Sequence, residues 1–279
     1  MRGVVSFFLL CPFAMIALAS CGQRPLEPRD PTPGVPHFHV ATFNMRDIAS
    51  RDPETVDAVG STGAEIVALQ EVTDEWEPIL RARYSARYPN MIFHADGSAG
   101  IGFLSVYPLR EYKLISAPNG WHPASHVHVK TPAGWLGVLN VHLHSPEVGG
   151  TDSIGALQAV PKQHVDEINL FREESSHAPD PCFHGGPVLV LGDFNEGDDG
   201  AAVSYLEDLG FQNVLPLYHP GQFTWRHKSV GGQFNQALDH ILFDGSMQSL
   251  NAYVGDGGTS DHLPVIAHFE ASYPWPQTE

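Results

Sequence analysis

The chain has 279 residues, of which 42% are hydrophobic and 17% are charged, and its formal charge is −17. This balance is typical of a globular protein with a sizeable core, and it excludes a chain that is disordered throughout. Fifteen Lys and Arg residues against 32 Asp and Glu residues also make a long basic face for nucleic acid an unfavourable interpretation. A bound divalent metal could still supply positive charge locally.

Residues 1–20 have the pattern of an export signal. Arg2 precedes an apolar run over residues 4–19, which is the single long apolar run of the chain and contains Pro12. The run is short for a membrane span, so we predict a signal peptide and not a transmembrane helix. Its removal takes away one cation and leaves a formal charge of −18 on the remaining chain.

The cleavage site has two interpretations. The segment LASC (18–21) resembles the bacterial lipoprotein signal, which implies that Cys21 becomes the lipidated first residue. The segment ALA (17–19) also fits an A-x-A site, which would release a soluble protein and leave Cys21 able to pair with Cys182. We favour lipidation of Cys21, because a Cys at this position is rare by chance in a chain with few Cys. The expected location is therefore outside the cytoplasm, on a bacterial membrane facing the periplasm or the surface, with a secreted soluble protein as the alternative.

Residues 21–36 follow as a predicted tether, and residues 37–279 as one folded domain. Five Pro residues lie between residues 22 and 36 and favour an extended chain that forms no core. At about 3.1 Å per residue, this stretch could reach on the order of 45 Å. No linker or internal repeat divides the remaining 243 residues. We expect a monomer attached to a membrane through its N-terminal lipid.

The domain alternates short β-rich runs with a few helical patterns. A helix is expected over 52–62, with Asp52 as the N-cap and Pro53 at the first helical position. Further helices are expected over 73–84, over 151–175 with an interruption at Pro161, and over 201–209. Many strands with few helices predict an α/β fold in which two mixed sheets pack together with helices outside. The expected strands cover residues 37–43, 65–70, 90–95, 99–106, 110–117, 124–130, 135–143, 187–191, 222–226, 236–243, 248–255 and 263–270.

Six of these runs end in side chains that bind metals or transfer protons. Ligand sites of α/β proteins lie beyond strand ends, on loops that a rigid scaffold positions. A single carboxylate or imidazole at a strand end is usually a turn former or a structural residue. The six together are a stronger signal: TFN (42–44), LQE (69–71), VHLH (141–144), GDFN (192–195), LDH (238–240) and SDH (260–262).

In this order the segments resemble the endonuclease/exonuclease/phosphatase superfamily, the deoxyribonuclease-I-like proteins. The resemblance covers essentially the whole domain, and it implies a four-layer α/β sandwich that cleaves phosphoester bonds with a divalent metal. It rests on ATFNMR (41–46), IVALQEV (66–72), GIGFLSVYP (100–108), VLNVHLHS (138–145), VLVLGDFNE (188–196), ALDHILF (237–243) and SDHLPV (260–265).

The resemblance implies a metal site built from oxygen ligands. Glu71 is the expected carboxylate ligand, Asn44 assists it, and Asp261 contributes from the far side. Oxygen ligands suit Mg²⁺, which keeps several of its waters, and Mn²⁺ is a possible substitute.

The other matched residues would handle protons and the phosphate. His262 is expected to accept the proton of the attacking water, with Asp239 fixing its tautomer. Asp193 would align or deprotonate the same water, and the division of labour between Asp193 and His262 stays open. Asn195 would donate to a phosphate oxygen, and Arg46 is a candidate cation for substrate.

Two histidines of the segment VHLHS compete for one role. The common family pattern selects His142 as the residue that stabilises or protonates on the opposite side, whereas a second pattern selects His144. We expect His142 to be catalytic and His144 to contact substrate.

A zinc site is a further alternative, because His126 and His128 share a strand face. If Pro132 and Ala133 form a two-residue hairpin, His126 pairs with Leu139 and His128 with residue 137, on the face opposite to His142. A three-residue loop would reverse the faces. Without Cys partners no standard structural zinc spacing is present, so we expect both to be ordinary strand residues.

The substrate is the open question, because one fold hosts many phosphoesterases. The first hypothesis is a metal-dependent phosphodiesterase that acts on nucleic acid or a small phosphodiester. The second is a sphingomyelinase-like enzyme, for which Trp121, Tyr273 and Trp275 are the candidate membrane contacts. The third is a binding module without catalysis, which the complete set of motifs disfavours.

Overall fold

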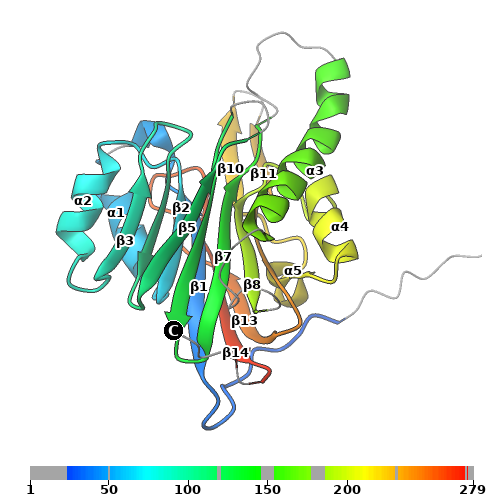
Figure 1. Ribbon diagram of the computed structural model, residues 1–279. Helices are drawn as coiled ribbons and strands as arrows, with labels where there is room; N and C mark the ends of the chain where they lie inside the picture. The colour runs from blue at the N-terminus through cyan, green and yellow to red at the C-terminus, as the bar shows by residue number, and fades with distance from the viewer. Residues whose placement is uncertain are drawn as a thin grey trace, which may run out of the picture.

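Two mixed six-stranded sheets pack face to face, with helices on their outer faces (Figure 1). This arrangement confirms the predicted four-layer α/β sandwich. The computed structural model describes residues 24–49, 51–117, 121–145, 154–176, 186–229, 232–273 and 275. Residues 1–20, Cys21 and Cys182 lie outside the described residues, so the signal, the lipidation and the disulfide stay predictions. Within the described residues, no helix is both long and apolar enough to span a membrane.

The first sheet carries two helices on its outer face. Helix α1 (Pro53–Ser61) starts where the sequence predicts, since the Asp52 side chain accepts a hydrogen bond from the Thr55 amide at 2.7 Å. Helix α2 (Trp76–Tyr84) begins three residues later than expected. The strands, in the order β13-β14-β1-β2-β4-β3, are β13 (Met247–Val254), β14 (Val265–Ala271), β1 (His37–Asn44), β2 (Ile66–Gln70), β4 (Ile101–Ser105) and β3 (Asn90–His94).

The second sheet is covered by α3 (Ile154–Ser176) and α4 (Ala201–Asp208). The segment between β9 and β12 adds the short helix α5 (Val214–Tyr218) and the hairpin β10 (Trp225–Ser229)–β11 (Gly232–Gln236). The sheet order is β5-β6-β7-β8-β12-β9, with β5 (Leu109–Ile115), β6 (Ala124–Thr131), β7 (Gly134–His142), β8 (Val188–Asp193), β12 (Asp239–Phe243) and β9 (Gln212–Asn213).

The largest core lies between the two sheets. Alternate residues of each central strand point into it, as the two-residue period of a strand requires. Phe38 and Val40 of β1 meet Leu189 and Leu191 of β8 in this layer. A buried polar contact crosses the same layer, because Gln70 Nε2 donates to Asn140 Oδ1 at 2.6 Å.

The β6–β7 hairpin has the predicted register. Thr131 pairs with Gly134, His126 with Leu139 and His128 with Gly137. Leu139 belongs to the outer core beneath α3 and α4, so His126 and His128 lie on the face opposite to His142.

A close approach of β7 and β8 requires a glycine at the end of β8. Gly192 has a φ of 143°, and a Cβ there would lie 1.9 Å from the Val141 carbonyl oxygen. Glycine alone fits both the conformation and the space. This contact places the residue that follows, Asp193, directly beside His142.

The structure departs from the sequence-based expectations in further places. Helix α3 continues through Pro161, although the ring removes one backbone hydrogen bond from the helix. Helix α5 and strands β9 and β11 were not expected. Part of the predicted tether also lies on the domain: the Leu26 amide donates to the Leu217 carbonyl at 2.7 Å, and Arg29 contacts Glu270 at 2.8 Å. The reach of a free extended chain therefore does not apply to residues 24–36.

Candidate active site

Most of the predicted catalytic side chains lie at the ends of rows of inward-facing side chains, which begin in the apolar core. On β8 the row runs from Leu189 and Leu191 to Asp193, and on β12 from Phe243 and Ile241 to Asp239. Strand alternation therefore aims these carboxylates into the space between the sheets, beyond the last apolar layer. Adjacent strands place His142 and Asp239 each opposite Asp193.

Three residues just after strand ends adopt left-handed backbone conformations. Glu71 has a φ of 57° directly after β2, whereas Arg46 (63°) and Asn195 (51°) lie two residues after β1 and β8, respectively. Such a conformation is unfavourable for a residue with a side chain and costs of order 1–3 kcal/mol. At Glu71 the turn brings the carboxylate back to the Asp47 amide, which donates to Oε2 at 2.8 Å. The strain coincides with three predicted site residues.

Asp193 is the central carboxylate of the site. It is 1% exposed, and its Oδ2 accepts a hydrogen bond from Asn44 Nδ2 at 2.9 Å. His142 Nε2 and His262 Nε2 each lie 3.6 Å from the same oxygen. The backbone amide of Asn195 donates to Asp193 Oδ1 at 2.9 Å. Asp193 thus connects four of the residues that the sequence had singled out.

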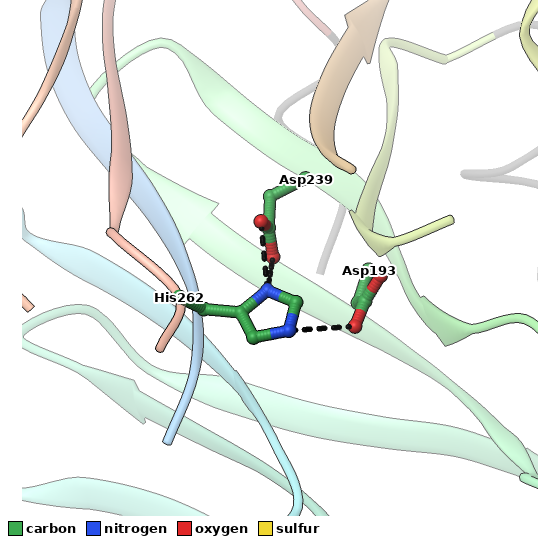
Figure 2. A group of neighbouring side chains, drawn as sticks. All are labelled: Asp193, Asp239 and His262. Carbon is green, nitrogen blue, oxygen red and sulfur yellow. Dashed lines mark hydrogen bonds and ion pairs between the residues drawn. The ribbon is translucent and has the colours of Figure 1, made fainter. Parts of the chain in front are cut away.

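Asp239 and His262 form the predicted pair. His262 Nδ1 lies 2.9 Å from Asp239 Oδ2 and 3.1 Å from Oδ1, so the opposite ring nitrogen points to Asp193 (Figure 2). Thr224, which the sequence analysis missed, donates to Asp239 Oδ2 at 2.6 Å. Ser260 holds the loop by donating to the Asn44 carbonyl at 2.9 Å. The imidazole is therefore fixed between two buried carboxylates.

This environment favours the charged ring. Burial by itself would lower the pKa of His262, but Asp239 and Asp193 outweigh it and raise the pKa to about 10. Burial would raise the pKa of Asp193, but His262 and His142 outweigh it and hold that pKa below its usual value. The protein groups alone therefore favour an imidazolium at His262 beside an ionised Asp193.

Two of the expected metal ligands, Glu71 and Asp261, line a cavity next to Asp193. Glu71 lies on its wall, and burial raises the pKa of this carboxyl. A cation beside Glu71 would offset that cost, so the oxygen donor fits Mg²⁺. Asp261 also lines the cavity, where Arg46 Nε lies 3.5 Å from its Oδ1.

Asn44 is oriented differently from a metal ligand. Its Nδ2 donates to both Glu71 Oε1 and Asp193 Oδ2 at 2.9 Å, while its oxygen accepts the Arg46 amide at 2.9 Å. In this orientation Asn44 fixes the two carboxylates, and ligation through oxygen would require the amide to turn over.

A second donor set lies next to the first. Ligand atoms of Asp193, Asp239 and His262 come within 4.8 Å of one another, and this buried group could hold a metal. Two of its members already form a hydrogen bond with each other, between His262 Nδ1 and Asp239 Oδ2. A cation there would have to displace that contact, whereas Glu71 presents its carboxylate to the cavity.

A cavity of about 550 Å³ opens above these groups. His142 lines it, whereas His144 packs edge-on against Trp121, with ring centroids 4.3 Å apart. The geometry thus places His142, and not His144, on the cavity wall. The lining residues that the sequence analysis did not single out as site residues are Asp47, Ile48, Ser98, His122, Ser145, Trp225, His227, Gln236 and Leu238.

His122 is the most informative of the missed residues. Its ring stacks on that of His142 with centroids 3.8 Å apart, and burial with His142 nearby lowers its pKa to about 3. A neutral ring can pack against His142 without adding charge. Because residue 122 lies twenty positions before His142 on another segment, only the fold brings the two together.

Helix α3 and the loop after β8 hold the segment that follows His142. The His144 amide donates to Glu167 at 3.0 Å, and the His144 carbonyl lies 2.7 Å from His164 Nε2. His164 Nδ1 lies 2.8 Å from Glu196, whose carboxylate also accepts the first amides of α4. Asn195 is tied to the same segment, since its Nδ2 donates to the Leu143 carbonyl at 2.9 Å.

Comparison with known proteins gives a family and a fold. The sequence profile described as "Endonuclease/Exonuclease/phosphatase family" matches residues 41–262. A search of curated protein sequences found no match.

Solved structures of low identity share the fold. An endonuclease/exonuclease/phosphatase from Beutenbergia cavernae superposes with a TM-score of 0.65 at 16% identity, over 86% of this chain and 72% of that one. D. rerio TDP2, solved with a single-strand DNA product, gives 0.63 at 16% identity, over 84% and 98%. ANGEL2, described as a 2′,3′-cyclic phosphatase and solved with adenosine-2′,3′-vanadate, gives 0.62 at 14% identity, over 89% and 99%.

The raised pKa of His262 predicts a pH-dependent stability. A group whose pKa is raised by folding stabilises the folded chain while it is protonated, so this contribution is complete below about pH 6.5 and lost as the pH rises to about 10. In EDTA, we expect the free energy of unfolding of the wild type to fall across this window relative to His262→Gln. Urea titrations at several pH values measure it, and parallel curves for the two proteins would contradict the assignment.

Proposed function

The chain belongs to the endonuclease/exonuclease/phosphatase family, and from this premise we propose that it is a divalent-metal-dependent hydrolase that cleaves a phosphodiester by in-line attack of water. The observation that carries the proposal is the position of Asp193 on the cavity, between His142 and His262 and joined through Asn44 to Glu71. One compact group thus offers a proton acceptor, hydrogen-bond donors for a phosphate and a carboxylate for a cation.

The charges support one division of labour between the acid and the base. Asp193 is the ionised oxygen donor, so it is suited to align the attacking water and accept its proton. His262, as an imidazolium held by Asp239, is suited to donate to a phosphoryl oxygen from Nε2. The reverse division, with His262 as the base, requires the ring to lose its proton before each turnover.

The remaining residues position the phosphate. His142, on the strand at one side of β8, lies 3.6 Å from Asp193 Oδ2, whereas His262 is held by Asp239 from the strand at the other side. His142 can therefore donate to a leaving or non-bridging oxygen. Asn195 is fixed by its contacts to Asp193 and Leu143. Glu71 would hold Mg²⁺ or Mn²⁺, with Asp261 and Asn44 near it. Such an ion polarises the phosphoryl oxygen and offsets charge on the leaving oxygen.

Nucleic acid or a small nucleotide-like phosphodiester is the substrate class that the cavity supports best. Trp225 and His227, which line it, stack with ring centroids 5.4 Å apart and offer an aromatic surface for a base. The neighbours solved with single-strand DNA and with an adenosine vanadate act on compounds of this class. A formal charge of −18 without the signal favours short substrates over long ones.

A phospholipid is the second candidate, supported by exposed apolar side chains beside the cavity. Ile48 lines the cavity and is 74% exposed, and Phe234 on β11 is 59% exposed. Two of the three residues that the sequence analysis considered for membrane contact fit less well, because Trp275 is only 2% exposed and donates to the Ser246 carbonyl, and Trp121 contacts His144. The third, Tyr273, is 52% exposed.

The metal role is tested with the substrate class. We expect EDTA to abolish hydrolysis, Mg²⁺ or Mn²⁺ to restore it, and Glu71→Gln to lower it by about 10²-fold or more, because the variant keeps the shape but loses the ligand charge. The measurement is turnover on single-strand DNA, a cyclic nucleotide, a phosphomonoester and sphingomyelin liposomes. Glu75→Gln, on the surface, is the control variant. Full turnover in EDTA would contradict the metal role, and headgroup release alone would favour the lipid candidate.

His262 and Asp239 should act as one unit. His262→Ala is expected to lower kcat by about 10²–10⁴-fold, the range for loss of acid–base catalysis. Asp239→Asn should cost somewhat less, and the double variant should be little worse than His262→Ala, because the second change removes a partner that is already lost. Single-turnover rates measure the cycle. Losses that multiply would show that the two residues act independently.

We also propose that the chain is exported and anchored by lipid on Cys21. We expect Cys21→Ser to move the protein from the membrane fraction to the soluble fraction, because the thiol that carries the lipid is gone. Mass spectrometry of the mature N-terminus checks the same point, with Cys182→Ser as the matched control. An N-terminus at Ser20 would establish the A-x-A site in its place.

A further inference from the structure

Three histidines lie together on the outer face of the first sheet, at the end away from the catalytic cavity. His37 and His39 are two positions apart on β1, and His268 stands directly opposite His39 on β14. The two-residue period of a strand puts all three on one face. Seven residues separate His37 from Asn44, which is about 23 Å along an extended strand. In Figure 1 the start of β1 and the end of β14 lie at the lower end of the molecule, and β10–β11 at the upper end.

Two of the imidazole nitrogens are close to the spacing that one metal ion requires. His37 Nδ1 lies 2.9 Å from His268 Nε2, and the His39 ring stacks on the His268 ring with centroids 3.9 Å apart. Two nitrogens bound to one tetrahedral Zn²⁺ at about 2.0–2.1 Å stand roughly 3.3 Å apart. To bring three nitrogens around one ion, His37 would have to separate from His268 and the His39 ring would have to turn out of the stack. His37 is exposed, so its ring has room to turn.

A carboxylate already orients the third ring. Glu65 Oε2 lies 3.2 Å from His39 Nδ1 and accepts the His39 amide at 2.7 Å. This contact leaves Nε2 of His39 for a ligand, which is the carboxylate–histidine arrangement found behind metal-binding histidines. Glu270, the other nearby carboxylate, is taken by Arg29 and Thr32.

The surroundings leave space for the ion and a fourth ligand. A cavity of about 300 Å³ lies against His268 and is lined by Asp30, Asn251 and Arg29, whose guanidinium is paired with Glu270.

We propose that His37, His39 and His268 form a binding site for a divalent transition metal, Zn²⁺ in the first place, separate from the catalytic site. Three imidazoles with one open position match a three-histidine zinc site, which water or the Asp30 carboxylate completes. The three ligands that the sheet supplies are imidazoles and not carboxylates, so the site favours Zn²⁺ over Mg²⁺. The ion would join the first and the last strand of the domain.

Equilibrium dialysis against Zn²⁺, with metal analysis of the full chain, tests the site without reference to activity. We expect His37→Ala/His268→Ala to bind one Zn²⁺ fewer than the wild type, or to bind it at least about tenfold more weakly. Excess Mg²⁺ is present in every arm to occupy the catalytic site. His219→Ala is the matched control, because His219 is exposed and lies far along the chain after α5. Equal stoichiometry and affinity in the double variant and the wild type would overturn the proposal.

A second variant keeps the test independent of folding. Glu65→Gln retains all three imidazoles and is expected to weaken Zn²⁺ binding by roughly tenfold, because the His39 ring loses its orienting charge. Zn²⁺ should also raise the Tm of the wild type and of His219→Ala, but not of the double variant, since a ligand that binds only the folded chain stabilises it. A Zn²⁺-dependent rise in Tm of the same size in the double variant would count against the site.

Discussion

The buried negative charge of Asp193 is the constraint on which the rest of the active site depends. A carboxylate that is 1% exposed must be matched by hydrogen bonds and positive charge, or it will be protonated. Its partners come from both sheets: Asn44 from the first sheet, and His142 from the strand beside β8. Neutralising this one group therefore fixes how the two sheets meet at their catalytic end.

The layer between the sheets becomes polar just before the site residues, where Gln70 and Asn140 form a hydrogen bond from one sheet to the other. Asn140 accepts from Gln70 and donates to the Leu69 and Gly102 carbonyls at 3.1 and 3.2 Å. Such a network tolerates only one register, because a shift would leave buried amides without partners. It lies between the apolar core and the candidate catalytic residues, so it fixes where His142 and Asn44 lie at the ends of their strands. The strained turn at Glu71 then begins directly after Gln70.

The features that the sequence predicted are those that interactions between neighbouring residues determine. The Asp52 cap, the two-residue hairpin after Thr131 and the strands that end in site residues each depend on a few neighbouring residues. The orientation of Asn44 was not predictable in this way, since it depends on two carboxylates distant in the chain. His122 and the packing of residues 24–36 were missed for the same reason. Helix α5 is too short for a periodic pattern to reveal it.

An acidic chain can still bind a phosphate, because the charge that matters is local. Arg46 is partly neutralised by Asp261, so it contributes little net charge to the cavity. The positive charge within the protein comes instead from His262, whose proton is retained by the very carboxylates that surround it. One imidazolium between two carboxylates leaves an excess of negative charge even without substrate, and a phosphate adds to it. A cation at Glu71 would offset that excess, so the acidic surroundings themselves couple phosphate binding to metal binding.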